Sequence, residues 1–246
     1  MRIHIKRWFM ALLLALLLIA GYAYLYFNGY SGVHLESSTE EGQIKVACVG
    51  DSITYGLGVS SWPDNNYPAV LENLLGTEYH VMNFGESGRC VQETADKPYI
   101  KEKSYTNSLA YDSDILIFMM GTNDSKPYNW NGKAVFLEAY EKILDSYMQR
   151  EHPPKLYLCT PATAFYVKGE TDGEAGYDIQ PKVVEEIAQI IRDFATVYQK
   201  EEALIDINFM TKEHPEWFEK DGIHPNIEGA KAIAEYIASY IAEATK

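Results

Sequence analysis

The sequence has few cysteines and no spacing of the kind that builds a metal site. Its three cysteines are Cys48, Cys90 and Cys159, an odd number that excludes complete pairing within one chain. No C-x-x-C pair occurs, and the histidines lack a metal-ligand spacing such as H-E-x-x-H. Cys48 and Cys159 lie in apolar runs, as buried small side chains do. We therefore expect no metal ion in this protein.

Several motifs of nucleotide-binding and hydrolytic proteins are also absent or incomplete. No P-loop is present, and the G-x-S-x-G elbow of the α/β-hydrolases does not occur around Ser52, the serine considered below. The run GLGVSS, residues 56–61, begins like a dinucleotide fingerprint but lacks its third glycine.

Positive charge is scarce outside the first seven residues. The chain has 21 Lys and Arg against 35 Asp and Glu, a formal net charge of −14. Arg2, Lys6 and Arg7 contribute +3, and the first acid is Glu36, so the remainder carries −17. Binding to phosphates needs clustered cations, so nucleic acid is excluded as a partner. The acidity is typical of a surface that keeps a domain soluble.

Charge of either sign is absent from residues 8–27, WFMALLLALLLIAGYAYLYF. A helix of this length spans roughly 30 Å, the thickness of a hydrocarbon core. The basic residues precede it, so the positive-inside rule predicts a single-pass anchor with a cytoplasmic N-terminus and an extracytoplasmic domain. The alternative is a secreted protein whose signal is cleaved after GYA, residues 21–23, or GYS, residues 29–31.

Beyond this segment the chain reads as a linker followed by one domain. Residues 31–42 are polar and lack periodicity, as a tether does. We expect an anchor or signal at 1–30, a linker at 31–42 and a single domain at 43–246. Strand-like runs alternate with helix-like runs, which predicts a parallel sheet with helices on both faces. The expected strands are 43–49, 79–84, 114–120, 155–160 and 203–207, and the expected helices are 67–75, 134–149, 181–200 and 226–243.

Polar residues follow four of the five expected strands. GDSIT with Ser52 follows the first strand, GESGR with Gly85 the second, GTND with Asn123 the third, and DGIHP with Asp221 and His224 comes after the fifth. The carboxyl ends of parallel strands meet at one edge of a sheet, where functional residues gather. If the first strand is central, Gly85 and Asn123 fall on either side of Ser52.

This set of residues suits acyl transfer. A serine hydroxyl becomes nucleophilic when a histidine takes its proton and a carboxylate orients that histidine. Ser52, His224 and Asp221 can fill these three roles. The N–H of Ser52, the N–H of Gly85 and the side-chain amide of Asn123 can stabilise the tetrahedral oxyanion. Glycine at position 85 leaves the approach free of a Cβ.

Each motif also has a purely structural explanation. Asp51 and Ser52 can cap a helix, and Asn123 can cap another. DGIHP can be a turn with Pro225 at the first helical position. All four motifs in order, each after a strand, favour a catalytic constellation over four separate caps and turns.

The motifs GDSIT, GESG, GTND and DGIHP resemble the four blocks of the SGNH (GDSL) hydrolases, across residues 44–230. The resemblance implies a flavodoxin-like three-layer α/β/α fold with a five-stranded parallel sheet, preceded here by the transmembrane helix. It implies ester hydrolysis without metal or organic cofactor. It makes Ser52 the nucleophile, His224 the base, Asp221 its partner, and Ser52, Gly85 and Asn123 the oxyanion donors.

The ester itself is less well defined. GTNDSKPYNW and NFGESGR look most like the members that remove acetyl groups from carbohydrates, including sialate and plant-polysaccharide O-acetylesterases. Candidate substrate contacts are Asp51, Arg89, Tyr128 and Trp130, where Arg89 would meet a substrate carboxylate or form a surface ion pair. Loop aromatics suit a sugar ring; further candidates of this kind are Trp62, Tyr67, Phe165 and Tyr166. A lysophospholipase or thioesterase, a cell-wall sugar O-acyltransferase and an inactive membrane-tethered binding module remain alternatives.

Overall fold

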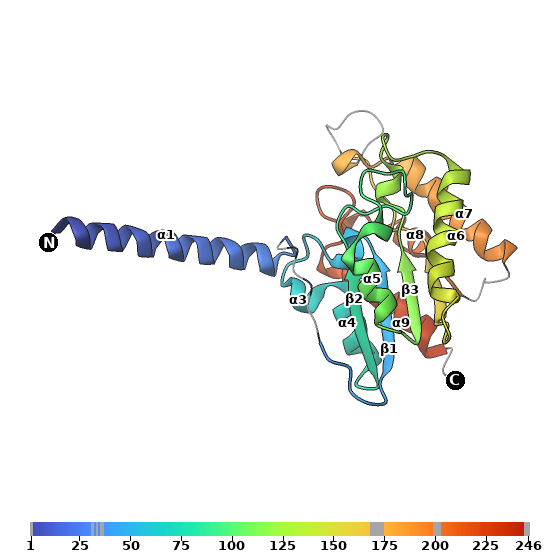
Figure 1. Cartoon of the computed structure of the whole chain (residues 1–246). Helices are drawn as coiled ribbons and strands as arrows, with labels where there is room; N and C mark the ends of the chain where they lie inside the picture. Colours follow the sequence, from blue (N-terminus) through green and yellow to red (C-terminus); the bar gives the residue numbers. More distant parts are fainter. Residues whose placement is uncertain are drawn as a thin grey trace.

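The computed structural model describes residues 2–30, 32, 34, 37–167, 175–198 and 203–243. Its centre is a parallel sheet with the strand order β2-β1-β3-β4-β5 (Figure 1). The strands are β1 (Ile44–Gly50), β2 (Tyr79–Gly85), β3 (Ile115–Met119), β4 (Lys155–Cys159) and β5 (Leu204–Ile205). The strand order and the parallel pairing confirm the predicted five-stranded α/β sheet, with β1 between β2 and β3.

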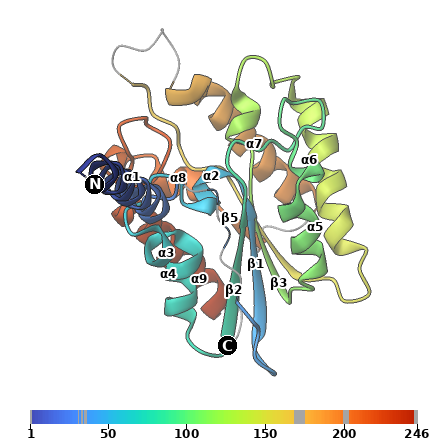
Figure 2. The same ribbon diagram turned by 60° about the vertical axis from the view of Figure 1, so that its left-hand side comes forward.

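Alternating residues of β1 face two different helical layers. Val46 and Cys48 pack with α4 (Tyr67–Leu75) and α9 (Ile227–Glu243) on one face of the sheet. Ala47 and Val49 pack on the other face, against three helices, α5 (Lys103–Ala110), α6 (Lys133–Met148) and α7 (Pro181–Val197). Figure 2 shows the sheet between these two layers. The period of two in a strand buried on both faces produces the predicted three-layer arrangement.

The register of the sheet aligns the strand ends that carry the motifs. Gly50 pairs with Gly85 on one side and with Met119 on the other. A Cβ on Gly50 would lie 2.0 Å from Thr54 Oγ1 and 2.6 Å from the Met119 carbonyl oxygen. Glycine at position 50 therefore lets the chain turn sharply from β1 into the short helix α2 (Ser52–Tyr55).

The differences between the expected and the observed elements include the short strand β5 and the additional helix α5. The expected strand 203–207 is only Leu204–Ile205, because Asp206 caps the helix α8 (Ile207–Thr211) by accepting the N–H of Phe209. Helix α5 was not expected, because its sequence KSYTNSLA offers little helical periodicity of apolar residues.

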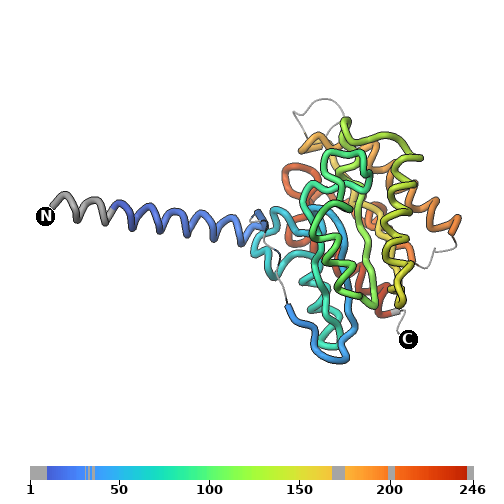
Figure 3. The backbone as a smooth tube through the Cα atoms, in the orientation of Figure 1, coloured from blue at the N-terminus to red at the C-terminus, as the bar shows by residue number. Residues whose placement is uncertain are grey.

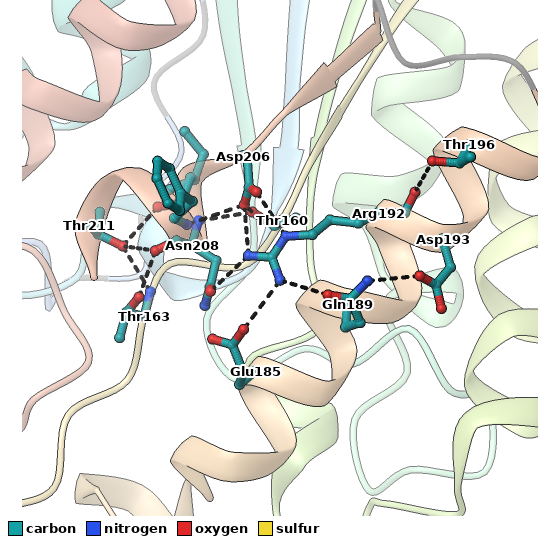
Figure 4. A network of polar contacts seen from close by, with 12 residues as sticks. Thr160, Thr163, Glu185, Gln189, Arg192, Asp193, Thr196, Asp206, Asn208 and Thr211 are labelled. Atoms are coloured by element: carbon teal, nitrogen blue, oxygen red, sulfur yellow. Dashed lines mark hydrogen bonds and ion pairs between the residues drawn. The ribbon is translucent and has the colours of Figure 1, made fainter. Parts of the chain in front are cut away.

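A polar network ties α7 to the carboxyl ends of β4 and β5 (Figure 4). The Arg192 guanidinium contacts Asp206 Oδ2 at 2.8 Å, and Thr160 Oγ1 donates to Asp206 Oδ1 at 2.9 Å. Thr163 N–H donates to Thr211 Oγ1, so the segment after β4 is fixed on α8. This segment leads to Phe165, whose N–H donates to the carbonyl of Gly222 at 2.8 Å. The network therefore supports the loop that carries Asp221.

The N-terminal helix α1 (Arg2–Phe27) projects away from the domain (Figures 1 and 3). Residues Met10–Phe27 are long and apolar enough to cross a membrane, and none of them is buried against the protein. After the helix, the described linker residues lie on the domain surface. His34 pairs with Glu86 at 3.2 Å, and Ser37 Oγ lies 2.8 Å from His80 Nε2. At these positions the linker contacts the domain, whereas the sequence predicted a tether without such contacts.

Candidate active site

Ser52 occupies the first residue of α2, at the carboxyl end of β1. Asp51 caps this helix, with its Oδ1 accepting the N–H of Ile53 at 2.9 Å. Burial raises the pKa of Asp51, which is 1% exposed and does not line the cleft beside Ser52. Asp51 therefore caps α2, and its burial outside the cleft does not favour the predicted contact with substrate. The sharp turn leaves the Ser52 side chain at the cleft.

His224 connects Ser52 to Asp221. Its Nε2 lies 2.9 Å from Ser52 Oγ, and its Nδ1 lies 2.7 Å from Asp221 Oδ2. Asp221 Oδ1 accepts the N–H groups of Ile223 at 2.9 Å and of His224 at 3.0 Å, which fixes the short loop between them. The predicted Ser52, His224 and Asp221 thus lie in one hydrogen-bonded chain.

The charge on Asp221 follows from these contacts. Burial by itself raises the pKa of Asp221, but the hydrogen bonds and positive field of His224, together with the two backbone amides, lower it overall. An ionised carboxylate only accepts hydrogen bonds, so the proton of the 2.7 Å contact belongs to His224 Nδ1. Nε2 is then the acceptor for the Ser52 hydroxyl. This arrangement can remove a proton from Ser52.

Asn123 contributes a free donor to the same cleft. It begins the 3₁₀ turn η2 (Asn123–Ser125) that follows β3, and its backbone carbonyl accepts a hydrogen bond from Asn129 at 3.1 Å. Its side-chain Nδ2 is buried and makes no hydrogen bond to any residue that the structure describes. A buried amide without a partner is costly, which is typical of a group held for a ligand.

The structure corrects the expected role of Gly85. The Gly85 N–H donates to Asn83 Oδ1 at 2.9 Å, and Gly85 does not line the cleft. A Cβ on Gly85 would lie 2.2 Å from the backbone nitrogen of Tyr55, so this glycine allows α2 to pack on β2. Gly88, three residues later, lines the cleft with Ser52 and Asn123. It has a φ of +79°, and its N–H donates to no acceptor in the described chain.

This difference between the two glycines can be measured by unfolding. Gly85→Ala is expected to lower the free energy of unfolding by roughly 3 kcal/mol, because the new methyl group overlaps the backbone of α2. In Gly88→Ala the new methyl group would lie next to the flexible Lys97 side chain alone among the described residues, 3.7 Å from its Cδ. The expected cost of this substitution is about 1 kcal/mol, from the left-handed backbone alone. Urea denaturation of both variants checks the order, and equal losses would contradict it.

The remaining substrate-contact candidates lie away from the cleft. Arg89 Nε contacts Glu102 Oε1 at 2.8 Å and its guanidinium also pairs with Glu86, so the ion-pair alternative describes it. Trp130 packs toward Phe136, with ring centroids 6.1 Å apart. Tyr128 is exposed but does not line the cleft.

The other loop aromatics are mostly structural. Trp62 and Tyr67 are buried at 2% and 1% exposure, and the Trp62 ring stacks on Tyr55. The expectation that these two side chains stack on a sugar is therefore wrong. Phe165 packs against Phe218, whereas Tyr166 is exposed. Residues 168–174 of the expected polar loop lie outside the described residues.

The cleft has a volume of about 210 Å³ and includes residues that sequence reasoning missed. Tyr177 lies edge-on to the His224 ring, with centroids 5.5 Å apart, and has an unusual φ of +59°. Residues with backbone dihedrals of this kind cluster at functional sites. Lys97 and Lys126 also line the cleft. Only Lys126 had a sequence signal, its place three residues after Asn123. Within the described residues no group of acidic, His and Cys side chains suits a metal ion.

A three-layer α/β/α domain with Ser, Asn and His gathered at the carboxyl ends of its strands defines the class of SGNH-type hydrolases. The chain belongs to the GDSL-like lipase/acylhydrolase family, which it matches over residues 48–232. It is 34% identical over 220 residues to an acetylxylan esterase of Xylanibacter ruminicola. That match covers 82% of this chain and 44% of the relative, so the chain spans less than half of the relative's length.

Two solved structures share the fold. A putative arylesterase from Agrobacterium tumefaciens superposes with a TM-score of 0.65 at 20% identity, covering 82% of this chain and 99% of the other. Est24, a carbohydrate acetylesterase from Sinorhizobium meliloti, gives the same TM-score of 0.65 and the same 20% identity, with coverage of 82% and 99%. At this identity the similarity establishes the common architecture.

Proposed function

We propose that the chain is a serine esterase that removes acetyl groups from carbohydrates. The observation that carries the proposal is the hydrogen-bonded chain from Asp221 through His224 to Ser52, which ends in a cleft beside the unpartnered amide of Asn123. The expected catalytic residues Ser52, Asp221 and His224 and the expected donor Asn123 fit this chemistry, and we assign to Gly88 the donor role that was expected of Gly85.

The reaction proceeds through two tetrahedral intermediates. Ser52 Oγ attacks the ester carbonyl while its proton moves to His224 Nε2, and Asp221 stabilises the imidazolium. The oxyanion accepts hydrogen bonds from the N–H of Ser52, the N–H of Gly88 and Asn123 Nδ2. Collapse breaks the bond to the sugar oxygen, which takes the proton from His224 and leaves an acetyl-enzyme. Water then attacks that ester with His224 again as base, releasing acetate and restoring Ser52.

The small cleft favours a short acyl group. Leu57, Ile179 and Ile223 are its apolar lining residues, beside a polar wall that includes Ser87 and Thr122. Each buried CH₂ contributes about 0.8 kcal/mol, so a long acyl chain needs an extended apolar trough. The exposed ring of Tyr177 suits the face of a sugar. The acetylxylan esterase relative acts on a substrate of this class by name.

The acyl preference can be tested directly. We expect kcat/KM for p-nitrophenyl esters to fall from acetyl to octanoyl, and acetate to be released from acetylated xylan or another acetylated glycan. A series of acyl lengths and a coupled acetate assay measure both. Preference for octanoyl, with no acetate from any glycan, would instead favour a lipid acyl hydrolase. Transfer of acetyl to an added sugar in place of water would favour an O-acyltransferase.

We further propose that α1 anchors the catalytic domain to the outer face of a membrane, with Arg2, Lys6 and Arg7 in the cytoplasm. The end of α1 contacts the domain: Asn28 accepts the N–H of Gly58 at 3.0 Å, and the Tyr26 ring lies 5.8 Å from Trp62. Cleavage after residue 31 would remove these contacts, which supports retention of the helix.

The full-length chain is therefore expected in the membrane fraction, released by detergent and not by carbonate. A variant lacking residues 2–27 serves as the control and is expected to be soluble. Protease added to spheroplasts should digest the domain of the full-length chain. A soluble wild-type form that begins near residue 24 or 32 would instead show a cleaved signal.

A further inference from the structure

Two lysines line the wall of the cleft. Lys97 comes from the loop after β2, and Lys126 ends the η2 turn that begins with Asn123. The described residues that line the cleft include both lysines but no Asp or Glu. The whole chain has 35 acidic residues against 21 basic ones, so two lysines without an acidic residue in the same described lining are unusual for its composition.

Among the described residues neither amine is paired with a carboxylate, although the charge of Lys126 acts over a longer distance on the buried Asp51. Within the part of the chain that the structure describes, neither Lys97 nor Lys126 forms an ion pair or a side-chain hydrogen bond. Six other cations of the domain pair with carboxylates, whereas lysines on the outer surface, such as the exposed Lys101 and Lys103, form no ion pair with any described residue. Arg89 is instructive, because it is close in sequence to Lys97 but pairs with Glu86 and Glu102 outside the cleft.

Both lysines are close to the groups proposed to carry the reaction. The Lys97 side chain lies next to Gly88. Its Nζ is 3.8 Å from the position that a Cβ on Gly88 would occupy. Lys126 is half-buried and donates its backbone N–H to the Asn123 carbonyl at 3.4 Å. The two amines therefore approach the cleft from the two loops that also carry Gly88 and Asn123.

We propose that Lys97 and Lys126 form an anion subsite that binds a carboxylate on the sugar from which the acetyl group is removed. The inference rests on the proposed esterase function and narrows its substrate to acetylated acidic carbohydrates, such as uronic acid derivatives. An acetyl group is small and uncharged, so only the alcohol part of the ester can supply the anion. Charge-assisted contacts of this type are stronger than neutral ones, and they also speed association.

Matched substrates separate this subsite from a general effect on catalysis. The anionic substrate is a monoacetylated methyl glucuronoside, and the neutral ones are its C6 methyl ester and the equally acetylated methyl glucoside. For the wild-type protein we expect kcat/KM to be about tenfold higher for the glucuronoside than for the glucoside. Added NaCl should reduce this preference, because salt screens partly exposed charges.

Removal of either lysine should reduce the preference. Lys97→Gln and Lys126→Gln are each expected to lower the glucuronoside-to-glucoside ratio about threefold to tenfold, chiefly through KM, and the double variant should abolish it. Lys97→Arg and Lys126→Arg should retain most of the ratio. Lys101→Gln is the matched control, since Lys101 is exposed, close in sequence to Lys97 and outside the cleft.

Three outcomes would overturn the subsite. If the wild-type protein shows no preference for the glucuronoside, the two amines do not contribute to substrate binding. Equal losses on all three substrates in the lysine variants would make the lysines general contributors to catalysis. A stronger preference for a glucoside 6-sulfate would mean that the subsite binds a sulfate ester and not a carboxylate. Failure of the esterase function itself is distinguished by p-nitrophenyl acetate, which the wild type would then leave intact.

Discussion

Ser52→Ala is expected to lower kcat for p-nitrophenyl acetate by about 10⁶-fold, to the level left by binding and oxyanion stabilisation alone. The reason is that His224 Nε2 has Ser52 Oγ as its hydrogen-bond partner at 2.9 Å. No other hydroxyl of the described chain contacts that nitrogen. Without the hydroxyl, no acetyl-enzyme can form. A steady-state assay with a sensitive product readout measures the loss.

The fold is expected to survive this substitution. The α2 helix is capped by Asp51 and the backbone of Ser52, and neither contact uses the Ser52 side chain. Circular dichroism and a thermal unfolding curve check this point. Ser239→Ala, on the exposed side of α9, is a matched control that should retain activity.

Covalent labelling gives an independent readout of the same residue. A fluorophosphonate should modify the wild-type protein at Ser52 and leave Ser52→Ala unmodified, because the reagent needs an activated serine. Peptide mapping by mass spectrometry locates the adduct. An adduct on another residue, or substantial activity in the variant, would contradict the assignment of the nucleophile.

The sequence was sufficient to predict the sheet and most of the site because both depend on local patterns. Strands buried on two faces appear as apolar runs, and three of the four motifs directly follow such a run, whereas DGIHP comes after β5 and α8. The predicted Ser52, Asn123, Asp221 and His224 do meet at one edge of the sheet. Their catalytic roles stay predictions until the variants are measured.

The error at Gly85 has a physical cause that sequence reasoning could not resolve. The run GESG contains two glycines, one required by close packing and one in a left-handed turn. Both requirements select glycine, so the residue type alone does not tell them apart. Only the three-dimensional contacts show that Gly85 lies against Tyr55, whereas Gly88 faces the cleft.

The lysines were missed for a related reason. The loop that carries Gly88 and Lys97 has no periodicity, and its position depends on a distant side chain. Asp124 is buried, accepts the N–H groups of Val91 at 2.9 Å and of Gln92 at 2.8 Å, and so holds this loop beside η2. Burial raises the pKa of Asp124 to about 7. A contact between residues 33 positions apart leaves no local signature in a single sequence.

Asn123→Ala is expected to lower kcat by about 10²–10³-fold with little change in KM, because an oxyanion donor acts mainly in the transition state. The side-chain Nδ2 is buried and unpartnered in the described protein, so its removal breaks no internal hydrogen bond. The backbone carbonyl of Asn123, which accepts from Asn129, is kept by alanine. Stability should therefore change little, and the kinetic loss can be assigned to the missing donor.

The kinetic measurement separates this role from simple binding. Asn131→Ala provides the control, since Asn131 is exposed and its amide contacts Thr94 and Asn129 outside the cleft. An increase in KM with unchanged kcat would mean that Asn123 binds the ground state of the substrate as strongly as the transition state. The oxyanion would then depend on the N–H groups of Ser52 and Gly88. A fall in kcat alone, with KM and stability preserved, is the result that follows from a buried amide held free beside the reacting serine.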